Sequence, residues 1–227
     1  MSLLDSLLGI VAPHDCLACG AEGNLLCGLC AGSLQGIPDR CYRCRKLMND
    51  SLTCEKCRQT SLLYSVKVAA VYGSVAKGLI WKLKLGGAQS SARIMAKYMA
   101  QQVRVADRSV IIPVPTATSR IRQRGYDQAR LIARELSLQT RAPYFDRLRR
   151  VGQMHQHGLS RQARLSQLSA VFRLKRPEQL RGRHVLLVDD VITTGATLEA
   201  AALVLRSAGA KRVEAVVFAQ PEFINNI

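Results

Sequence analysis

The sequence predicts an α/β protein in which a parallel sheet flanked by helices follows a small cysteine-rich module. Three observations lead to this prediction. All eight cysteines lie within residues 16–57. From about residue 65 onward, apolar segments typical of strands alternate with segments of helical periodicity. One strand, in the stretch VLLVDDVITTGATL (185–198), ends in two adjacent aspartates and a Thr/Gly-rich turn. The chain of 227 residues suits one domain plus a smaller module, and the expected division is 1–62 and 63–227.

The cysteines form four C-x-x-C pairs, which are Cys16/Cys19, Cys27/Cys30, Cys41/Cys44 and Cys54/Cys57. Two cysteines three positions apart on a tight turn direct both sulfurs toward one point, and two such turns complete a tetrahedral zinc site. Joining consecutive pairs predicts two zinc ribbons, whereas a cross-braced arrangement of first with third and second with fourth is the alternative. Four thiolates close each coordination shell, so both zincs are expected to be structural. Disulfides are disfavoured in a reducing cytosol.

Strands and helices are expected to alternate after the cysteine-rich module. The expected strands are 65–72, 109–115, 184–190 and 212–220, and the expected helices are 75–87, 92–105, 127–139 and 196–209. Asp127 is the expected N-cap of the third helix, and Gly86 with Gly87 is a natural stop for the first. The strand 184–190 is almost continuously apolar, which is typical of a strand covered by helices on both sheet faces.

The net charge of +17 is unevenly distributed. Residues 1–65 carry six basic and six acidic residues, whereas residues 66–227 carry 27 basic and 10 acidic ones. A field of one sign attracts phosphates on a nucleotide, a nucleic acid or an acidic partner; the alternative is a solvated basic face. No apolar run approaches the ~20 residues of a membrane span. The start of the chain lacks a basic leader, so no membrane insertion and a cytoplasmic location are expected.

The two aspartates fall where parallel α/β folds bind ligands, beyond the carboxyl end of a strand. The turn after Asp189 and Asp190 leads into a helix N-terminus, whose free N–H groups and partial positive charge hold phosphate. Gly195 permits close backbone approach, and the threonines of the turn add hydroxyl donors. Adjacent carboxylates need partners, which ribose hydroxyls and a divalent cation supply. The segment therefore predicts a ribose 5-phosphate site; a merely structural turn with capping threonines is the alternative.

VLLVDDVITTGAT closely resembles the phosphoribosyl-pyrophosphate (PRPP) signature of type I phosphoribosyltransferases. Together with the four C-x-x-C pairs, PVPTATSRIRQRGYDQA and QMHQHGLSRQAR, it makes nearly the whole chain similar to the ComF/GntX family of competence-associated proteins. The resemblance implies a double zinc-ribbon module ahead of a type I phosphoribosyltransferase fold. It also implies uptake of single-stranded DNA in natural transformation, with a helicase or other competence protein as partner. Asp127 departs from the family, which usually has Asn there.

The resemblance also implies roles for individual residues. Asp189 and Asp190 would bind the ribose 2′- and 3′-hydroxyls of PRPP or a related ribose phosphate, directly or through Mg²⁺. The residues expected to hold the 5′-phosphate are Thr193, Thr194, Gly195, Ala196 and Thr197. The pyrophosphate is expected to meet the loop from Thr116 to Ser119, followed by Arg120, Arg122, Arg124 and Gly125. We expect these three arginines in a non-helical stretch, where spacing two places them along one face. A mobile basic lid is expected over 150–165, with His155, Gln156, Arg161 and Arg164 closing over pyrophosphate.

Three functions compete on this basis. The first is a Mg²⁺-dependent phosphoribosyltransferase whose acceptor the sequence does not identify. The second is a catalytically silent adaptor that keeps the phosphoribosyl site and bridges single-stranded DNA and a helicase partner. The low aromatic content of the chain, 5%, predicts that such an adaptor binds the phosphate backbone of DNA, with an affinity that falls steeply with salt. The third, a zinc-ribbon transcription factor, is disfavoured because the ribbon module is nearly neutral before its thiolates are counted.

Overall fold

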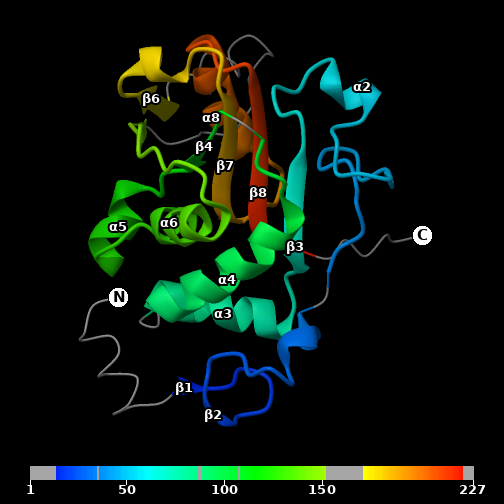
Figure 1. Ribbon diagram of the computed structural model, residues 1–227, viewed down its shortest axis with the longest axis vertical. Helices are drawn as coiled ribbons and strands as arrows, with labels where there is room; N and C mark the ends of the chain where they lie inside the picture. Colours follow the sequence, from blue (N-terminus) through cyan, green and yellow to red (C-terminus); the bar gives the residue numbers. More distant parts are fainter. Residues whose placement is uncertain (1–13, 35, 86–87, 107, 152–170, 222–227) are drawn as a thin grey trace.

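The computed structural model describes residues 14–34, 36–85, 88–106, 108–151 and 171–221. Its centre is a sheet of four parallel strands, which are labelled in the middle of Figure 1. In spatial order the strands are β3 (Val66–Val71), β8 (Arg212–Gln220), β7 (His184–Val191) and β4 (Ser109–Pro113). The expected α/β class with a parallel sheet is therefore confirmed.

Helices cover both faces of this sheet. The long helices are α3 (Ser74–Leu85), α4 (Ala88–Gln102), α6 (Gln128–Thr140) and α8 (Ala196–Ser207). One core joins α3, α4 and α6 to strand residues such as Leu186 and Val188, and the other joins α8 to Val185 and Leu187. Successive residues of β7 thus face opposite cores, which explains why its sequence is continuously apolar. None of the described helices is long and apolar enough to cross a membrane.

Shorter elements complete the described fold. They are β1 (His14–Asp15), β2 (Glu22–Gly23), η1 (Ala31–Ser33), α2 (Glu55–Arg58), α5 (Thr118–Arg124), β5 (Leu148–Arg150), β6 (Phe172–Leu174) and η2 (Pro177–Leu180). β1 pairs with β2, and β5 with β6, in two small antiparallel ribbons. The β5–β6 ribbon was not expected, because strands of three residues are too short to show a period in the sequence.

The cysteine-rich segment packs against both cores. Its first half lies beside α3 and α4: Leu17 packs against their core, and the Tyr98 hydroxyl donates to the Ala31 carbonyl at 2.7 Å. In its second half, Tyr42 is buried in the core on the α8 side, together with Leu63. Figure 1 shows β1 and β2 below α3 at the bottom of the view, and α2 at the upper right. The segment is therefore built into the fold from both sides of the sheet.

The stretch around the three arginines is helical, so the expected non-helical conformation is wrong. α5 ends where Gly125 adopts a left-handed φ of 82° and donates its N–H to the Ile121 carbonyl at 2.7 Å. On a helix, residues two apart point about 200° apart, whereas residues four apart share a face. Arg120 and Arg124 therefore lie together, and Arg122 points elsewhere. Seven residues are too few for helical periodicity to be recognised in a basic, polar segment.

β4 ends at Pro113 although the expected strand extended to residue 115. The N–H of Ile111 points away from β7 and donates to the Pro143 carbonyl, whereas that of Val114 donates to Val188. Because directions alternate along a strand, the N–H that proline lacks would also point away from β7. Pro113 thus costs the main sheet no hydrogen bond.

Truncation of the core between α6 and α4 is expected to destabilise the protein. Leu136 is fully buried with Met95, so Leu136→Ala should reduce the free energy of unfolding by about 2–5 kcal/mol. Leu138 on the same helix is 75% exposed, so Leu138→Ala should change it by less than about 0.5 kcal/mol. Urea denaturation of both variants measures the difference, and equal losses would contradict this packing.

Candidate functional site

A cleft of about 540 Å³ opens where the carboxyl ends of β4 and β7 lie side by side. Its lining combines two carboxylates, four cationic side chains, hydroxyls and backbone. The lining residues are Lys84, Val114, Pro115, Thr116, Ala117, Ser119, Arg120, Arg124, Gln128, Arg150, Asp189, Asp190, Val191, Thr193 and Thr197. The parallel register brings these together, because Pro113 pairs with Val188, next to the two aspartates.

The two carboxylates have different surroundings. Burial raises the pKa of Asp189 well above its ordinary value, and the charge of Asp190 raises it further, although the N–H of Asp190 donates to Asp189 Oδ1 at 2.9 Å. Asp190 accepts the N–H of Val191 at 2.8 Å, and its Oδ2 lies 3.3 Å from the Lys84 ammonium. The charged form of Asp189 is thus the less stable of the two carboxylates, because a second acid lies close to it. A cation or hydroxyl donors would stabilise that charge.

Cationic side chains from three separate parts of the chain face these carboxylates. Lys84 comes from the last turn of α3, Arg120 and Arg124 from α5, and Arg150 from the end of β5. Burial lowers the pKa of Arg150, and the charge of Arg120 lowers it further, whereas Asp189 opposes the shift. Cations gathered in a half-buried cleft favour a polyanionic ligand.

The loop at the cleft floor is held by the N-cap of α6. Asp127 accepts the Arg130 N–H at 3.4 Å, as expected for an N-cap, and is 5% exposed. Its carboxylate also accepts the N–H and the hydroxyl of Thr116, each at 3.1 Å. Asp127, the residue that departs from the resembled family's Asn, therefore fixes Thr116 in place just before α5. An amide has only one acceptor oxygen, so aspartate is the better partner for both Thr116 donors.

The turn from Thr193 to Thr197 is held from outside the sheet by the cysteine-rich segment. Arg45 Nη2 donates to the Thr193 carbonyl at 2.9 Å, and the Tyr42 ring lies against Gly195. A Cβ at residue 195, where φ is 79°, would lie 2.7 Å from Tyr42 Cε2. Glycine is therefore needed both for the left-handed φ and for contact with the ring.

The first turn of α8 is anchored in the same way. Glu199 accepts the Tyr42 hydroxyl through Oε1 and the Leu62 N–H, at 3.1 Å, through Oε2. The Tyr42 hydroxyl also lies 2.8 Å from Ser61 Oγ. An acid in the first turn of a helix normally repels a phosphate bound there. Here hydrogen bonds to the cysteine-rich segment engage both carboxylate oxygens of Glu199.

The structure brings most, but not all, of the predicted site residues into the cleft. Those that line it are Asp189, Asp190, Thr193, Thr197, Thr116, Arg120 and Arg124. Thr194, Gly195 and Gly125 lie in the flanking turns and Ala196 begins α8, and none of the four lines the cleft. His155, Gln156, Arg161 and Arg164 of the expected lid lie outside the described residues. Lys84 was missed, because nothing in a lysine on an amphipathic helix indicates where its tip lies. Arg150 begins the expected lid segment 150–165 without being one of the four residues expected to close over pyrophosphate, and it lines the cleft from the end of β5.

The eight sulfurs gather into two groups of four. The first cysteine cluster contains Cys16, Cys19, Cys27 and Cys30, and the second contains Cys41, Cys44, Cys54 and Cys57. Within each cluster the sulfur atoms lie within 4.8 Å of one another. This is the arrangement of consecutive pairs, not the cross-braced one. A tetrahedron with Zn–S bonds of about 2.3 Å has edges of about 3.8 Å, which matches the distances of 3.8 Å for Cys19–Cys27 and 3.5 Å for Cys44–Cys54.

The ionisation of the first cluster also suits a cation. The N–H of Cys27, followed by those of Cys19 and Ala18, lowers the pKa of the Cys16 thiol to about 6. Contacts with the sulfurs of Cys19 and then Cys27 raise the pKa of Cys30 to about 12. One thiolate forms readily, but four thiolates in contact repel one another unless a cation lies between them. The donor set and spacing therefore fit a tetrahedral metal ion.

The turns of the two clusters use the same backbone geometry with different residues. Gly20 follows the first cysteine pair with a φ of 75° and donates its N–H to the Cys16 carbonyl. Arg45 occupies the equivalent place in the second cluster, with a φ of 65° and an N–H to the Cys41 carbonyl. A left-handed arginine is unfavourable by itself. Its side chain is the one that reaches Thr193.

Neutralising Asp189 is expected to stabilise the protein when no ligand or Mg²⁺ is present. The pKa of this carboxyl is raised above its unfolded value of about 3.9, so the folded state binds more protons than the unfolded state above pH 4. Stability is therefore lost as pH rises from about 4 toward the raised pKa. Asp189→Asn avoids this loss while keeping an acceptor for the Asp190 N–H. Each kcal/mol gained raises Tm by about 2–4 °C, which calorimetry at pH 5 and pH 8 measures, with the larger gain at pH 8.

Asp146→Asn is the matched control. The Asp146 carboxylate accepts from Arg149 at 2.7 and 3.2 Å and lies 3.3 Å from Arg130 Nε, so its loss should lower Tm instead. A lower or unchanged Tm for Asp189→Asn at pH 8 would contradict the electrostatics assigned to the cleft.

Comparison with known proteins agrees with this geometry. Residues 87–222, which include the Thr116 loop and both aspartates of the cleft, match the phosphoribosyl transferase domain family. A solved structure of glutamine PRPP amidotransferase from B. subtilis, complexed with ADP and GMP, matches with a TM-score of 0.42 and 20% identity, over 57% of this chain and 27% of that chain.

Relatives of similar length carry two names. DNA utilization protein YhgH of Escherichia coli O6:H1 is 32% identical over 206 residues, covering 86% of this chain and 89% of the relative. Competence protein F of Haemophilus influenzae is 30% identical over 198 residues, covering 83% and 81%. The resemblance predicted from the motifs is thereby confirmed, and the chain belongs to the phosphoribosyltransferase domain family and, within it, to the ComF family.

Proposed function

We propose that this protein binds PRPP with Mg²⁺ in the cleft and handles single-stranded DNA during DNA uptake. One observation carries the first part: the Asp189–Asp190 pair, the 193–197 turn and four cationic side chains line one cleft of about 540 Å³. Such a cleft offers separate partners for the three parts of PRPP. The carboxylates suit the ribose hydroxyls, the turn suits the 5′-phosphate, and Lys84, Arg120, Arg124 and Arg150 suit the pyrophosphate.

As a transferase, the protein would cleave the bond between the anomeric carbon and pyrophosphate while an acceptor attacks that carbon. The arginines and Lys84 would balance the charge that develops on the departing pyrophosphate, and Asp189 and Asp190 would hold the sugar. Mg²⁺ bound with pyrophosphate would neutralise part of its charge and orient it. Thr116, fixed by Asp127, would place its backbone against the leaving group.

A catalytically silent adaptor is the second candidate. Among the described lining residues, Asp189 and Asp190 are the only carboxylates and no imidazole is present, so no further side chain is placed to accept a proton from an acceptor. A cleft that binds the ribose and phosphates but offers no base suits a sensor that binds PRPP without transferring it. In this form the protein would bridge single-stranded DNA and a helicase or other competence protein.

The DNA part of the proposal is supported by charge and by relatives. Residues 66–227 carry 27 basic and 10 acidic residues, and the relatives are named for DNA utilization and competence. With 5% aromatic residues, binding through phosphates is favoured over extended base stacking. Two clusters of reduced thiols suit the cytoplasm.

We also propose two structural zinc ions, one in each cysteine cluster, and a division of the chain at 62/63. The part before this boundary carries all eight cysteines, and the part after it carries the sheet. Tyr42 and Leu63 join the same core from the two sides of the boundary. Metal ions would therefore support the cleft without taking part in its chemistry.

Removing either cleft-facing arginine of α5 is expected to weaken PRPP binding. Arg120→Ala or Arg124→Ala should raise the Kd for PRPP–Mg²⁺ about tenfold or more, because a charge-assisted hydrogen bond contributes about 1.5–3 kcal/mol. Arg122→Ala, on the same helix but not lining the cleft, should leave the Kd unchanged. Calorimetric titration of the zinc-loaded protein measures all three, and absence of PRPP binding by the unaltered protein would refute the proposal.

The same titration with single-stranded DNA present separates the two candidates. PRPP affinity that DNA leaves unaffected indicates separate sites and directs the search toward an acceptor. PRPP binding that DNA displaces places the strand in the cleft and favours the adaptor.

The two cysteine clusters are expected to affect PRPP binding differently. Cys44→Ser in the second cluster should weaken PRPP binding severalfold or more, because Arg45 and Tyr42 hold the 193–197 turn. Cys19→Ser in the first cluster should leave PRPP affinity nearly unchanged, because that cluster lies beside α3 and α4. Titrations at a temperature where circular dichroism shows both variants folded decide this. Equal effects of the two variants would contradict the coupling.

A further inference from the structure

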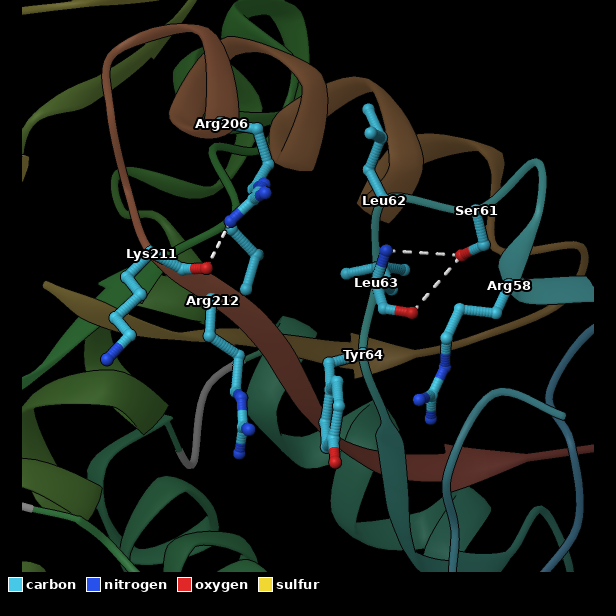
Figure 2. Close-up of a pocket in the computed structure, with 9 residues that line it drawn as sticks. Arg58, Ser61, Leu62, Leu63, Tyr64, Arg206, Lys211 and Arg212 are labelled. Carbon is cyan, nitrogen blue, oxygen red and sulfur yellow. Dashed lines mark hydrogen bonds between the residues drawn. The ribbon is translucent and has the colours of Figure 1, made fainter. Parts of the chain in front are cut away.

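A second basic pocket lies at the opposite end of the sheet from the cleft. It has a volume of about 300 Å³ and is here called the amino-end pocket, because it adjoins the first residues of β3 and β8 (Figure 2). Its lining residues are Arg58, Ser61, Leu62, Leu63, Tyr64, Arg206, Lys211, Arg212 and Val213. They come from α2, the segment before β3, the end of α8 and the start of β8.

The amino-end pocket is separate from the PRPP cleft. Asp189 pairs with Val217 on β8, five residues beyond Arg212. At about 3.3 Å per residue this places the two sites about 16 Å apart along the sheet. A ligand in one site therefore does not fill the other.

Two arginines in the pocket are held flat against one ring. The Arg212 guanidinium carbon lies 3.8 Å from the centre of the Tyr64 ring, and that of Arg58 lies 4.6 Å from it. Figure 2 shows the two side chains on either side of Tyr64. Stacking on an aromatic face restrains a guanidinium while leaving its N–H edge available. Both arginines therefore lose little conformational freedom when an anion binds.

Four cations line this pocket without an acidic partner. Among the described residues, none of Arg58, Arg206, Lys211 and Arg212 forms an ion pair. Arg206 Nη1 donates to the carbonyls of Ala210, at 2.8 Å, and Lys211. The nearest acid along β8, Glu214, accepts from Ser65 Oγ at 2.9 Å and does not line the pocket. Like charges gathered in this way repel one another, and a bound anion removes that repulsion.

We propose that the amino-end pocket binds the phosphodiester backbone of single-stranded nucleic acid. This inference rests on the DNA part of the proposed function and assigns the strand a site of its own. The N–H edges of Arg58 and Arg212 match phosphate oxygens, and Lys211 adds a point charge beside them. Leu62 and the outer, planar faces of the two guanidinium groups stacked on Tyr64 provide a flat surface that suits an unstacked base. An acidic peptide would use the charges but has no planar group for that surface.

The test is fluorescence anisotropy of a labelled oligothymidylate with the full-length, zinc-loaded protein over a range of salt concentrations. Lys211→Gln with Arg212→Gln should weaken binding about tenfold at low salt. It should also reduce the slope of log Kd against log salt by about 1.4, since each lost contact to a single strand removes about 0.7. Lys211→Gln alone leaves the Tyr64 stack intact and should reduce the slope by about 0.7. The matched control, Lys77→Gln with Lys97→Gln, removes the same charge from exposed positions of α3 and α4 and should change neither quantity appreciably.

PRPP binding and a competitor complete the experiment. PRPP affinity should be unchanged in the pocket variants, and excess inorganic pyrophosphate should displace the strand only weakly. If the pocket variants bind the strand normally while Arg120→Ala and Arg124→Ala do not, the strand lies in the cleft and this inference is wrong, although the proposed function stands. If the unaltered protein binds no strand at low salt, the DNA part of the proposed function fails with it. Loss of polyglutamate binding with normal oligothymidylate binding would instead assign the pocket to an acidic peptide.

Discussion

The contact between the second cysteine cluster and the 193–197 turn is the constraint on which the candidate site depends. Arg45 holds the Thr193 carbonyl, the Tyr42 ring packs against Gly195, and Glu199 accepts hydrogen bonds from the same segment. A turn between a strand and a helix is ordinarily exposed and mobile. Here it is fixed on its outer side, so its inner side is shaped before a ligand arrives. The cysteine-rich segment therefore supports the candidate site by holding its turn, although none of its residues lines the cleft.

Charged side chains are distributed differently at the two ends of the sheet. At the carboxyl end, cations face two carboxylates, and Lys84 pairs with Asp190. At the amino end, four cations line the pocket beside Tyr64, and the described lining residues include no acid. The first arrangement suits a ligand that carries hydroxyls or a metal ion as well as phosphates. The second suits phosphates alone. The proposed sugar phosphate and the proposed nucleic-acid strand would therefore bind in different places.

The cleft also shows how a binding site conflicts with stability. Asp189 is half-buried beside a second acid, so its charge destabilises the ligand-free fold. The cores on the two sheet faces compensate, since residues such as Leu187 and Val188 immediately before it are fully buried. Unfavourable charges of this kind are common in binding sites, where groups of the ligand stabilise them. Thr116 and Asp127 show the opposite case, a satisfied network that only positions a loop.

The sequence by itself determined the α/β class, the four main strands and the four long helices, because their periods are set by local geometry. It also determined the four C-x-x-C pairs and the place of Asp189 and Asp190 at a strand end, since short motifs carry their own geometry. Which pairs share a cluster was decided only by the structure, which groups consecutive pairs. Only the tertiary structure decided that α5 is a helix, with Arg120 and Arg124 on one face, and that Lys84 and Arg150 reach the cleft. The sequence also did not indicate that Tyr42 packs on Gly195. These features join residues far apart in the chain, and side chains meet across such distances only when the sheet and its helices have set their relative positions.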